Sequence, residues 1–92
     1  MNNIASLVHS YERALAAAEA AAKPKERNLC SLLLQEFGNL QRGLNATDPV
    51  TIQESLASQV QLFGRSFLSG ETGEAAEVAF NKVFRAIQSS GT

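Results

Sequence analysis

The sequence has little of the side-chain chemistry on which most small secreted domains and enzymes depend. Its 92 residues include one cysteine, one histidine, two prolines and no tryptophan. The single cysteine, Cys30, excludes an internal disulfide, and small secreted domains commonly need several. A reducing, cytoplasmic location is therefore expected.

Charge is also scarce. Charged residues make up 18% of the chain, and eight Lys and Arg balance nine Asp and Glu to leave a net charge of −1. A protein that coats nucleic acid carries a clear basic surplus, so a nucleic-acid partner is not the first expectation. Residues 1–4 have no positive charge, and no run approaches the roughly 18 consecutive apolar residues of a membrane span. We expect neither a secretion signal nor a membrane partner.

No combination of acid, base and nucleophile stands out. His9 and Cys30 are expected to lie roughly 13 Å apart along the helical rise, so the histidine cannot activate the thiol. No second Cys or His exists to complete a zinc site with them, and there is no glycine-rich phosphate loop. We therefore expect no enzyme, no catalytic residue, no metal and no cofactor. Cys30 is interpreted as a buried thiol and His9 as a half-exposed structural residue.

The chain is rich in apolar residues that recur at helical spacing. They form 45% of the sequence, and nothing alternates as a strand does. The spacing predicts four helices, over about residues 3–22, 24–42, 49–69 and 72–88. Residues 89–92 are expected to be a frayed tail.

Residues that begin or end helices occur at each predicted boundary. Pro24 is expected to stop the first helix and to open the second. Gly43 is expected to cap the second helix in a left-handed conformation. Asp48 precedes a proline and suits the start of the third helix, although a capping box at 51–54 permits a start three residues later. Thr72 is the expected cap of the fourth helix.

Side-chain sizes match when the chain is folded back at each of two turns. Residues equally far from the turn of an antiparallel helix pair lie at the same level, because both arms rise by about 1.5 Å per residue. Folding the last two helices together brings Gly64 opposite Ala79, which predicts a close approach of the two helices. The apolar pairs are Phe63 with Phe80, Val60 with Val83, Leu56 with Ile87 and Phe67 with Ala76. Folding at Pro24 pairs Ile4 with Leu44, Val8 with Leu40, Tyr11 with Phe37 and Leu15 with Leu33.

The predicted fold is all-α, a four-helix bundle built from two antiparallel αα-hairpins in a single domain, 1–92. The hairpins cover residues 3–44 and 49–88, and residues 45–48 link them. Neither hairpin buries its apolar face alone, so the two must pack together. The linker allows them to close within one chain or to swap between two chains.

Several apolar residues lie outside the main stripes of these helices. Leu62 has serines as its helical neighbours, and Leu34 lies beside Cys30. The outer side of the first helix consists mainly of alanine. These residues either widen the core face or form a contact surface for another helix. Under the second interpretation, the candidate partner-binding residues are Ala17, Ala21, Leu34 and Leu62.

The sequence thus favours a small non-enzymatic protein-interaction module, an adaptor or a chaperone-like protein. Its partner would be a helix of another protein or a second copy of itself in a homodimer. Small helical export chaperones share its size, low charge and hairpin architecture, but this is a similarity of type that no particular residues carry. The alternative is a small nucleic-acid-associated regulator that uses the basic first turn, formed by Lys23, Lys25 and Arg27, together with Arg42.

Overall fold

The computed structural model describes residues 3–65 and 68–90, and these are almost entirely helical. It confirms the predicted all-α, four-helix bundle. The elements are α1 (Asn3–Ala21), the short 3₁₀ turn η1 (Pro24–Glu26), α2 (Arg27–Ala46), α3 (Pro49–Arg65) and α4 (Gly70–Ser90).

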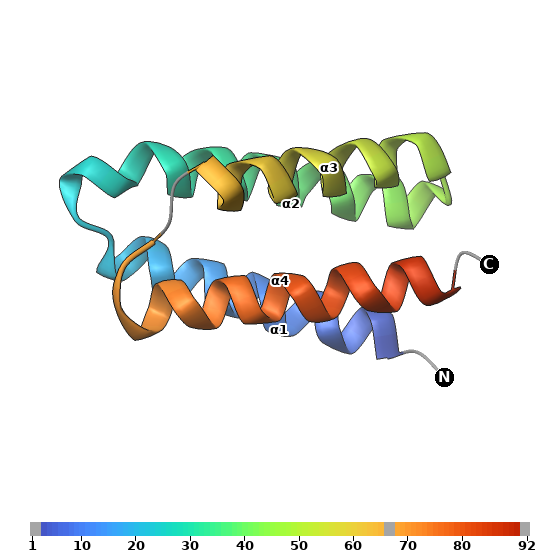
Figure 1. Cartoon of the computed structure of the whole chain (residues 1–92). Coiled ribbons are helices and arrows are strands. Elements are labelled where there is room, and N and C mark those ends of the chain that lie inside the picture. Colours follow the sequence, from blue (N-terminus) through green and yellow to red (C-terminus); the bar gives the residue numbers. More distant parts are fainter. Residues whose placement is uncertain (1–2, 66–67, 91–92) are drawn as a thin grey trace.

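The helices form two layers, with α1 beside α4 in one and α2 beside α3 in the other (Figure 1). The chain crosses between the layers twice at the same end of the bundle, once before α2 and once before α4. The start of α1, the end of α4 and the turn between α2 and α3 lie at the opposite end. Each hairpin of consecutive helices expected from the sequence therefore spans both layers, while the closest packing is within a layer.

The turn between α2 and α3 is shorter than expected. The linker reduces from 45–48 to Thr47 and Asp48, and α2 continues to Ala46. The left-handed residue is Thr47, at φ 53°, so the prediction of a left-handed cap at Gly43 is wrong. Gly43 is instead a packing glycine, because a Cβ there would lie only 3.0 Å from Cγ1 of Ile52.

Asp48 caps the start of α3, as predicted. Its Oδ1 accepts hydrogen bonds from the N–H groups of Val50 at 3.1 Å and Thr51 at 3.3 Å, and its Oδ2 accepts one from the Thr51 hydroxyl at 2.8 Å. These bonds satisfy donors that a helix start leaves without partners. The later start at 51–54 is therefore excluded.

The boundary between α3 and α4 differs from the expectation. The third helix ends at Arg65 rather than near residue 69, and the fourth begins at Gly70 rather than at Thr72. Gly70 has φ 78°, a conformation that suits glycine. Leu68 then packs so closely on Gly73 that a Cβ there would lie 2.2 Å from its carbonyl oxygen. The predicted contact of Phe67 lies outside the described residues, and the expected frayed tail is helical as far as Ser90.

A glutamate ties the two crossings together. Oε2 of Glu26, in η1, accepts hydrogen bonds from the N–H of Ser69 at 3.2 Å and from its hydroxyl at 2.8 Å. Oε1 of the same carboxylate accepts the N–H of Lys23 at 3.4 Å. The Glu26 side chain is buried, so one carboxylate fixes the positions of two connections that are 43 residues apart in sequence.

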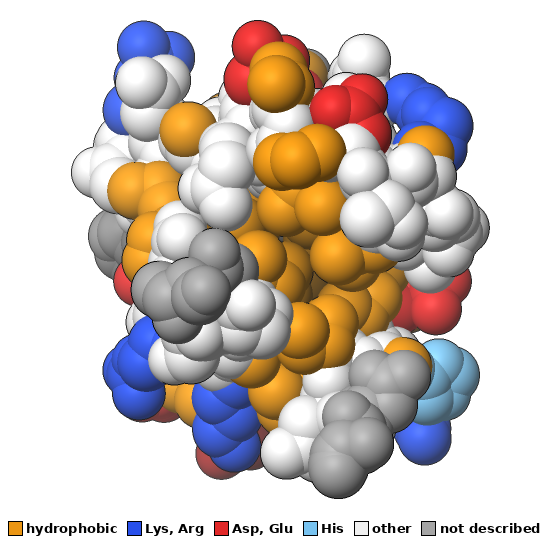
Figure 2. Space-filling view, turned by 90° about the vertical axis from the view of Figure 1, so that its right-hand side faces the viewer, with side chains coloured by type: hydrophobic (Ala, Val, Ile, Leu, Met, Phe, Trp, Pro, Cys, Tyr) orange, Lys and Arg blue, Asp and Glu red, His pale blue; other side chains and the backbone are white. Residues whose placement is uncertain are grey.

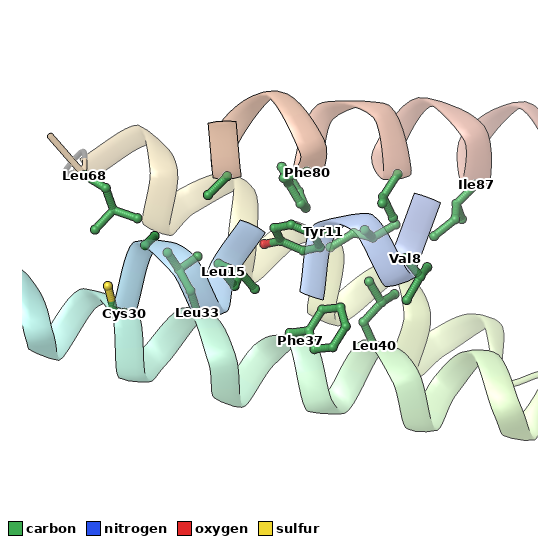
Figure 3. Close-up of a cluster of buried hydrophobic side chains, with 14 residues drawn as sticks. Val8, Tyr11, Leu15, Cys30, Leu33, Phe37, Leu40, Leu68, Phe80 and Ile87 are labelled. Carbon is green, nitrogen blue, oxygen red and sulfur yellow. The ribbon is translucent and has the colours of Figure 1, made fainter. Parts of the chain in front are cut away.

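The core runs along the whole interface between the layers (Figure 3). Tyr11 lies between the rings of Phe37 and Phe80, with centroid distances of 5.4 and 5.6 Å. The Phe63 and Phe80 rings lie 5.3 Å apart. The predicted levels of Tyr11 with Phe37 and of Phe63 with Phe80 are confirmed. The buried apolar residues are Val8, Tyr11, Leu15, Ala18, Cys30, Leu33, Phe37, Leu40, Leu56, Leu68, Ala76, Phe80, Val83 and Ile87.

Two details of α3 depart from the predicted pairing with α4. Val60, expected in the core, is 46% exposed, and Gln59 is fully buried in its place. A Cβ on Gly64 would meet no atom within 4 Å, so the close approach expected there is wrong. Both differences accompany the sideways packing of α3, which lies closer to α2 than to α4.

Candidate partner-binding surfaces

A groove opens between the first half of α1 and the last turns of α2, with a cavity volume of about 450 Å³. It exists because α1 packs on α4 and α2 packs on α3, which leaves α1 and α2 farther apart. Figure 2 views this end of the bundle and shows apolar side chains around a hollow. The groove is lined by Ile4, Ala5, Val8, His9, Glu12, Gln41, Leu44 and Asn45.

The groove combines an apolar floor with polar rims. Ile4, Val8 and Leu44 belong to the core cluster or pack against it. On the α1 rim, His9 is exposed, and its Nδ1 lies 3.8 Å from Oε1 of Glu12. An apolar groove bordered by polar groups is suited to the apolar face of an amphipathic helix.

His9 and Glu12 were not predicted to belong to a binding surface. The signal was present, because each rim carries polar residues one helical turn apart. His9 and Glu12 do so on α1, and Gln41 and Asn45 do so on α2. The sequence does not reveal that α1 and α2 lie apart, because their separation depends on which helices pack side by side.

Leu34 lies on the groove side of α2, and Leu62 lies elsewhere. Leu34 shares a helix face with Gln41 and Asn45, at spacings of seven and eleven residues, so it extends the α2 wall of the groove. Leu62 shares the face of α3 that carries Ser55 and Ser58, which line a separate hollow of about 220 Å³ against α2. Both leucines are half-buried and pack against the core.

Ala17 and Ala21 are exposed on a third surface. They continue the row of Leu7 and Ser10 along α1. Leu7 and Ser10 line a shallow groove of about 210 Å³ between α1 and α4, together with Ala75, Val78, Ala79 and Lys82. The four candidate partner-binding residues thus lie on three different surfaces and are not brought together.

The basic residues of the first turn are exposed, and the acid among them is not. Lys23, Lys25 and Arg27 face solvent, while the Glu26 carboxylate turns inward to Ser69. The hydrogen bond from the Ser69 hydroxyl holds the pKa of Glu26 below its usual range, supported by the N–H groups of Ser69 and Lys23. Arg42 lies fifteen residues along α2 from Arg27, about 22 Å away at the helical rise, and is not part of this group.

Cys30 and Tyr11 are buried titratable groups that line none of the three grooves described here. Burial raises the pKa of the Cys30 thiol, and the negative charges of Glu19 and Glu26 raise it further. Burial also raises the pKa of Tyr11. Within residues 3–65 and 68–90, no three His, Cys, Asp or Glu side chains are grouped so as to hold a metal ion. Over the same residues, no helix is both long enough and apolar enough to cross a membrane.

No family model, no curated protein and no solved structure matches this chain.

Proposed function

We propose that this chain is a small cytoplasmic, non-enzymatic protein-interaction module, an adaptor or a chaperone-like protein. Its groove between α1 and α2 receives the apolar face of an amphipathic helix from a partner protein. The observation that supports this proposal is the apolar floor formed by Ile4, Val8 and Leu44, which opens to solvent between polar rims. A second copy of the chain is the other partner expected from the sequence, and a different surface suits it.

The chemistry of the rims indicates what kind of helix fits. Glu12 places a carboxylate on the α1 rim, and Gln41 and Asn45 place amides on the α2 rim. A helix with Lys or Arg beside its apolar stripe would place a cation near the Glu12 carboxylate. Leu34, farther along the same face of α2, lengthens the apolar wall beyond the groove itself. The proposed occupant is therefore a basic amphipathic helix.

A peptide titration tests this proposal directly. Two 16-residue helical peptides with the same leucine stripe, one flanked by lysine and one by glutamate, are added to the isotope-labelled protein. We expect amide shifts along the first half of α1 and the last turns of α2, with the lysine peptide at least threefold tighter. Shifts scattered over the molecule, or none at millimolar peptide, would contradict the proposed groove.

Matched variants connect the binding to the groove. Ala5→Arg places a long side chain at the groove, while Ala20→Arg places the same side chain at another exposed position of α1. Both positions face solvent, so both variants should fold. A5R should weaken lysine-peptide binding at least tenfold, and A20R should leave it unchanged.

Crosslinking in the native cell identifies the partner. A photoreactive phenylalanine analogue at Ala5 should give a discrete covalent product, and the same analogue at Ala20 should not. Mass spectrometry then establishes whether the product contains another protein or only this chain. Equal products from the two positions would remove the groove from the proposal.

A nucleic-acid-associated regulator is the second candidate. The observation that favours it is the inward turn of the Glu26 carboxylate, which leaves Lys23, Lys25 and Arg27 as an exposed basic group. Binding through phosphate contacts weakens steeply with salt. Fluorescence anisotropy with a 20-nucleotide DNA and RNA at 20 and 200 mM salt tests it, and a K23E/K25E/R27E variant should abolish any true binding.

A further inference from the structure

The outer face of α4 carries a stripe of side chains that is symmetric about Val78. Its members are Glu71, Glu74, Val78, Lys82 and Arg85, at successive spacings of three, four, four and three residues. These spacings keep all five on one side of a helix. All five are exposed, and Val78 is 48% exposed. The stripe thus has an apolar centre, an acidic first half and a basic second half.

This order of charges is complementary to itself in an antiparallel arrangement. If two copies of α4 lie antiparallel with Val78 facing Val78, residues equally far from the centre meet. Glu74 then faces Lys82 of the second copy, and Glu71 faces Arg85 of the second copy. Two-fold symmetry repeats both pairs, so every charge of the stripe meets its opposite. A parallel arrangement would bring like charges together.

A single helix also gains from acids near its start and bases near its end. That effect does not account for the half-exposed valine at the centre of the stripe. In the described part of the chain, none of the four charged side chains of the stripe is held in an ion pair. They are therefore available to a second molecule, and the exposed Val78 gives that molecule an apolar contact.

The surface beside the stripe fits the same partner. The shallow groove formed by Leu7, Ser10, Ala75, Val78, Ala79 and Lys82 runs along it. Helices α1 and α4 are antiparallel with Tyr11 level with Phe80, which places Ala17 level with Glu74. Basic side chains of a second copy that reach the acidic half of the stripe would lay their apolar stems over Ala17 and Ala21.

We propose that the outer face of α4 is a two-fold interface, at which a second copy of this chain docks antiparallel with Val78 on the axis. The inference deepens the proposed function, since it names one partner of the interaction module. It uses a surface separate from the α1–α2 groove. Ala17 and Ala21, two of the residues expected from the sequence to bind a partner, lie beside this surface, in the same row of α1 as Leu7 and Ser10.

Sedimentation of matched valine variants provides the first test. The native protein should associate to a dimer whose dissociation constant rises with salt, because exposed ion pairs are screened. Val78→Lys should weaken the dimer at least tenfold. Val60→Lys is the control, since Val60 is 46% exposed on α3, and it should leave the dimer unchanged. Circular dichroism confirms that both variants fold.

Charge exchange tests the antiparallel pairing. An all-basic variant, E71K/E74K, and an all-acidic variant, K82E/R85E, should each be monomeric when alone. Mixed in equal amounts they should form a heterodimer, because every facing pair is then opposite in charge. The V78C thiols should also join in a disulfide on oxidation with copper phenanthroline, whereas V60C thiols should not. Cys30 does not compete, because it is buried.

A strict monomer at 200 μM, or a dimer unaffected by V78K, would overturn the proposal. The peptide titration of the α1–α2 groove, repeated on V78K, separates this inference from the proposed function. Peptide binding that survives in a monomeric V78K protein leaves the groove intact whatever happens at α4. Loss of peptide binding in A5R with an unchanged dimer would show that the α4 interface does not depend on the groove.

Discussion

Tyr11 and Gln59 meet in the centre of the bundle, where the tyrosine hydroxyl donates a hydrogen bond to Oε1 of the glutamine and both side chains are fully buried. The bond joins α1 to α3, which belong to different layers. The glutamine amide also donates to the carbonyl oxygen of Ser55 at 3.1 Å. A buried polar network whose members are all satisfied favours one arrangement of the helices over others.

Breaking this pair from one side should destabilise the protein. Tyr11→Phe leaves Oε1 of Gln59 buried without its donor, at a cost of about 1–3 kcal/mol in the free energy of unfolding. Gln59→Met leaves the tyrosine hydroxyl without its acceptor at a similar cost. The Y11F/Q59M double variant should be more stable than the sum of the two losses predicts. Urea denaturation of the three variants measures the coupling, and strictly additive losses would show that the pair contributes nothing.

The burial of Gln59 was not predictable from hydropathy. From Leu56, the next core position of a helix is reached at either the third or the fourth residue. Hydropathy selects Val60, while the structure uses Gln59, because Tyr11 brings a hydroxyl that requires an acceptor. That requirement comes from a residue 48 positions away in sequence, and no local pattern shows it.

The sequence predicts which residues lie at the same height along the bundle, but it does not predict which helices pack side by side. The position of a turn and the helical rise fix which residues share a level, so Phe63 was correctly placed against Phe80. Every antiparallel pair in the bundle obeys that rule, so it does not decide which helices pack closely side by side. The surfaces depend on that second choice, which is why Leu34, Leu62 and the pair Ala17 and Ala21 were expected together and lie apart.

Replacing each of two glycines of α2 by alanine should change the stability of the protein in opposite directions. A Cβ at Gly43 would lie 3.0 Å from Cγ1 and 3.1 Å from the backbone N of Ile52, so α3 would have to move. At Gly38 the nearest atom is Nη1 of Arg42 at 4.0 Å, the end of a flexible side chain. Gly38→Ala should therefore stabilise by about 0.5–1 kcal/mol through helix propensity. Gly43→Ala should destabilise by about 1–3 kcal/mol despite the same gain. Thermal and urea denaturation of the two variants provide the comparison, and stabilisation by both would contradict the close contact.

Acid should weaken the tie between the two crossings. The pKa of Glu26 is lowered in the folded protein, mainly by the Ser69 hydroxyl. Between that value and the unfolded pKa near 4.3, the unfolded state binds more protons, so stability falls as pH falls. Glu26→Gln should flatten the loss of stability between pH 6 and pH 3, as measured by urea midpoints. An unchanged slope would show that the carboxylate does not hold Ser69.

Asp48 provides the matched comparison for Glu26. Its pKa is also lowered, mainly by the Thr51 hydroxyl. Asp48→Asn should therefore also reduce the loss of stability between pH 6 and pH 3. The two carboxylates lie at opposite ends of α2, about 30 Å apart at the helical rise. Their effects on the slope should therefore add, and strong coupling between E26Q and D48N would contradict independent roles at the two ends.

Alkaline pH should destabilise the protein through its buried thiol and phenol. Burial raises the pKa of Cys30 and of Tyr11 in the folded state. Above the usual values of about 8.5 for Cys and 10 for Tyr, the unfolded chain loses a proton that the folded chain keeps, so stability falls as pH rises. Cys30→Ala should flatten the urea midpoint between pH 8.5 and 10, and Tyr11→Phe should flatten it only above pH 10. The two variants thus separate by the pH at which their effect begins, whatever each costs at neutral pH. A common onset would show that the alkaline loss arises from surface charge, and the exposed control Ala20→Arg would then shift it as well.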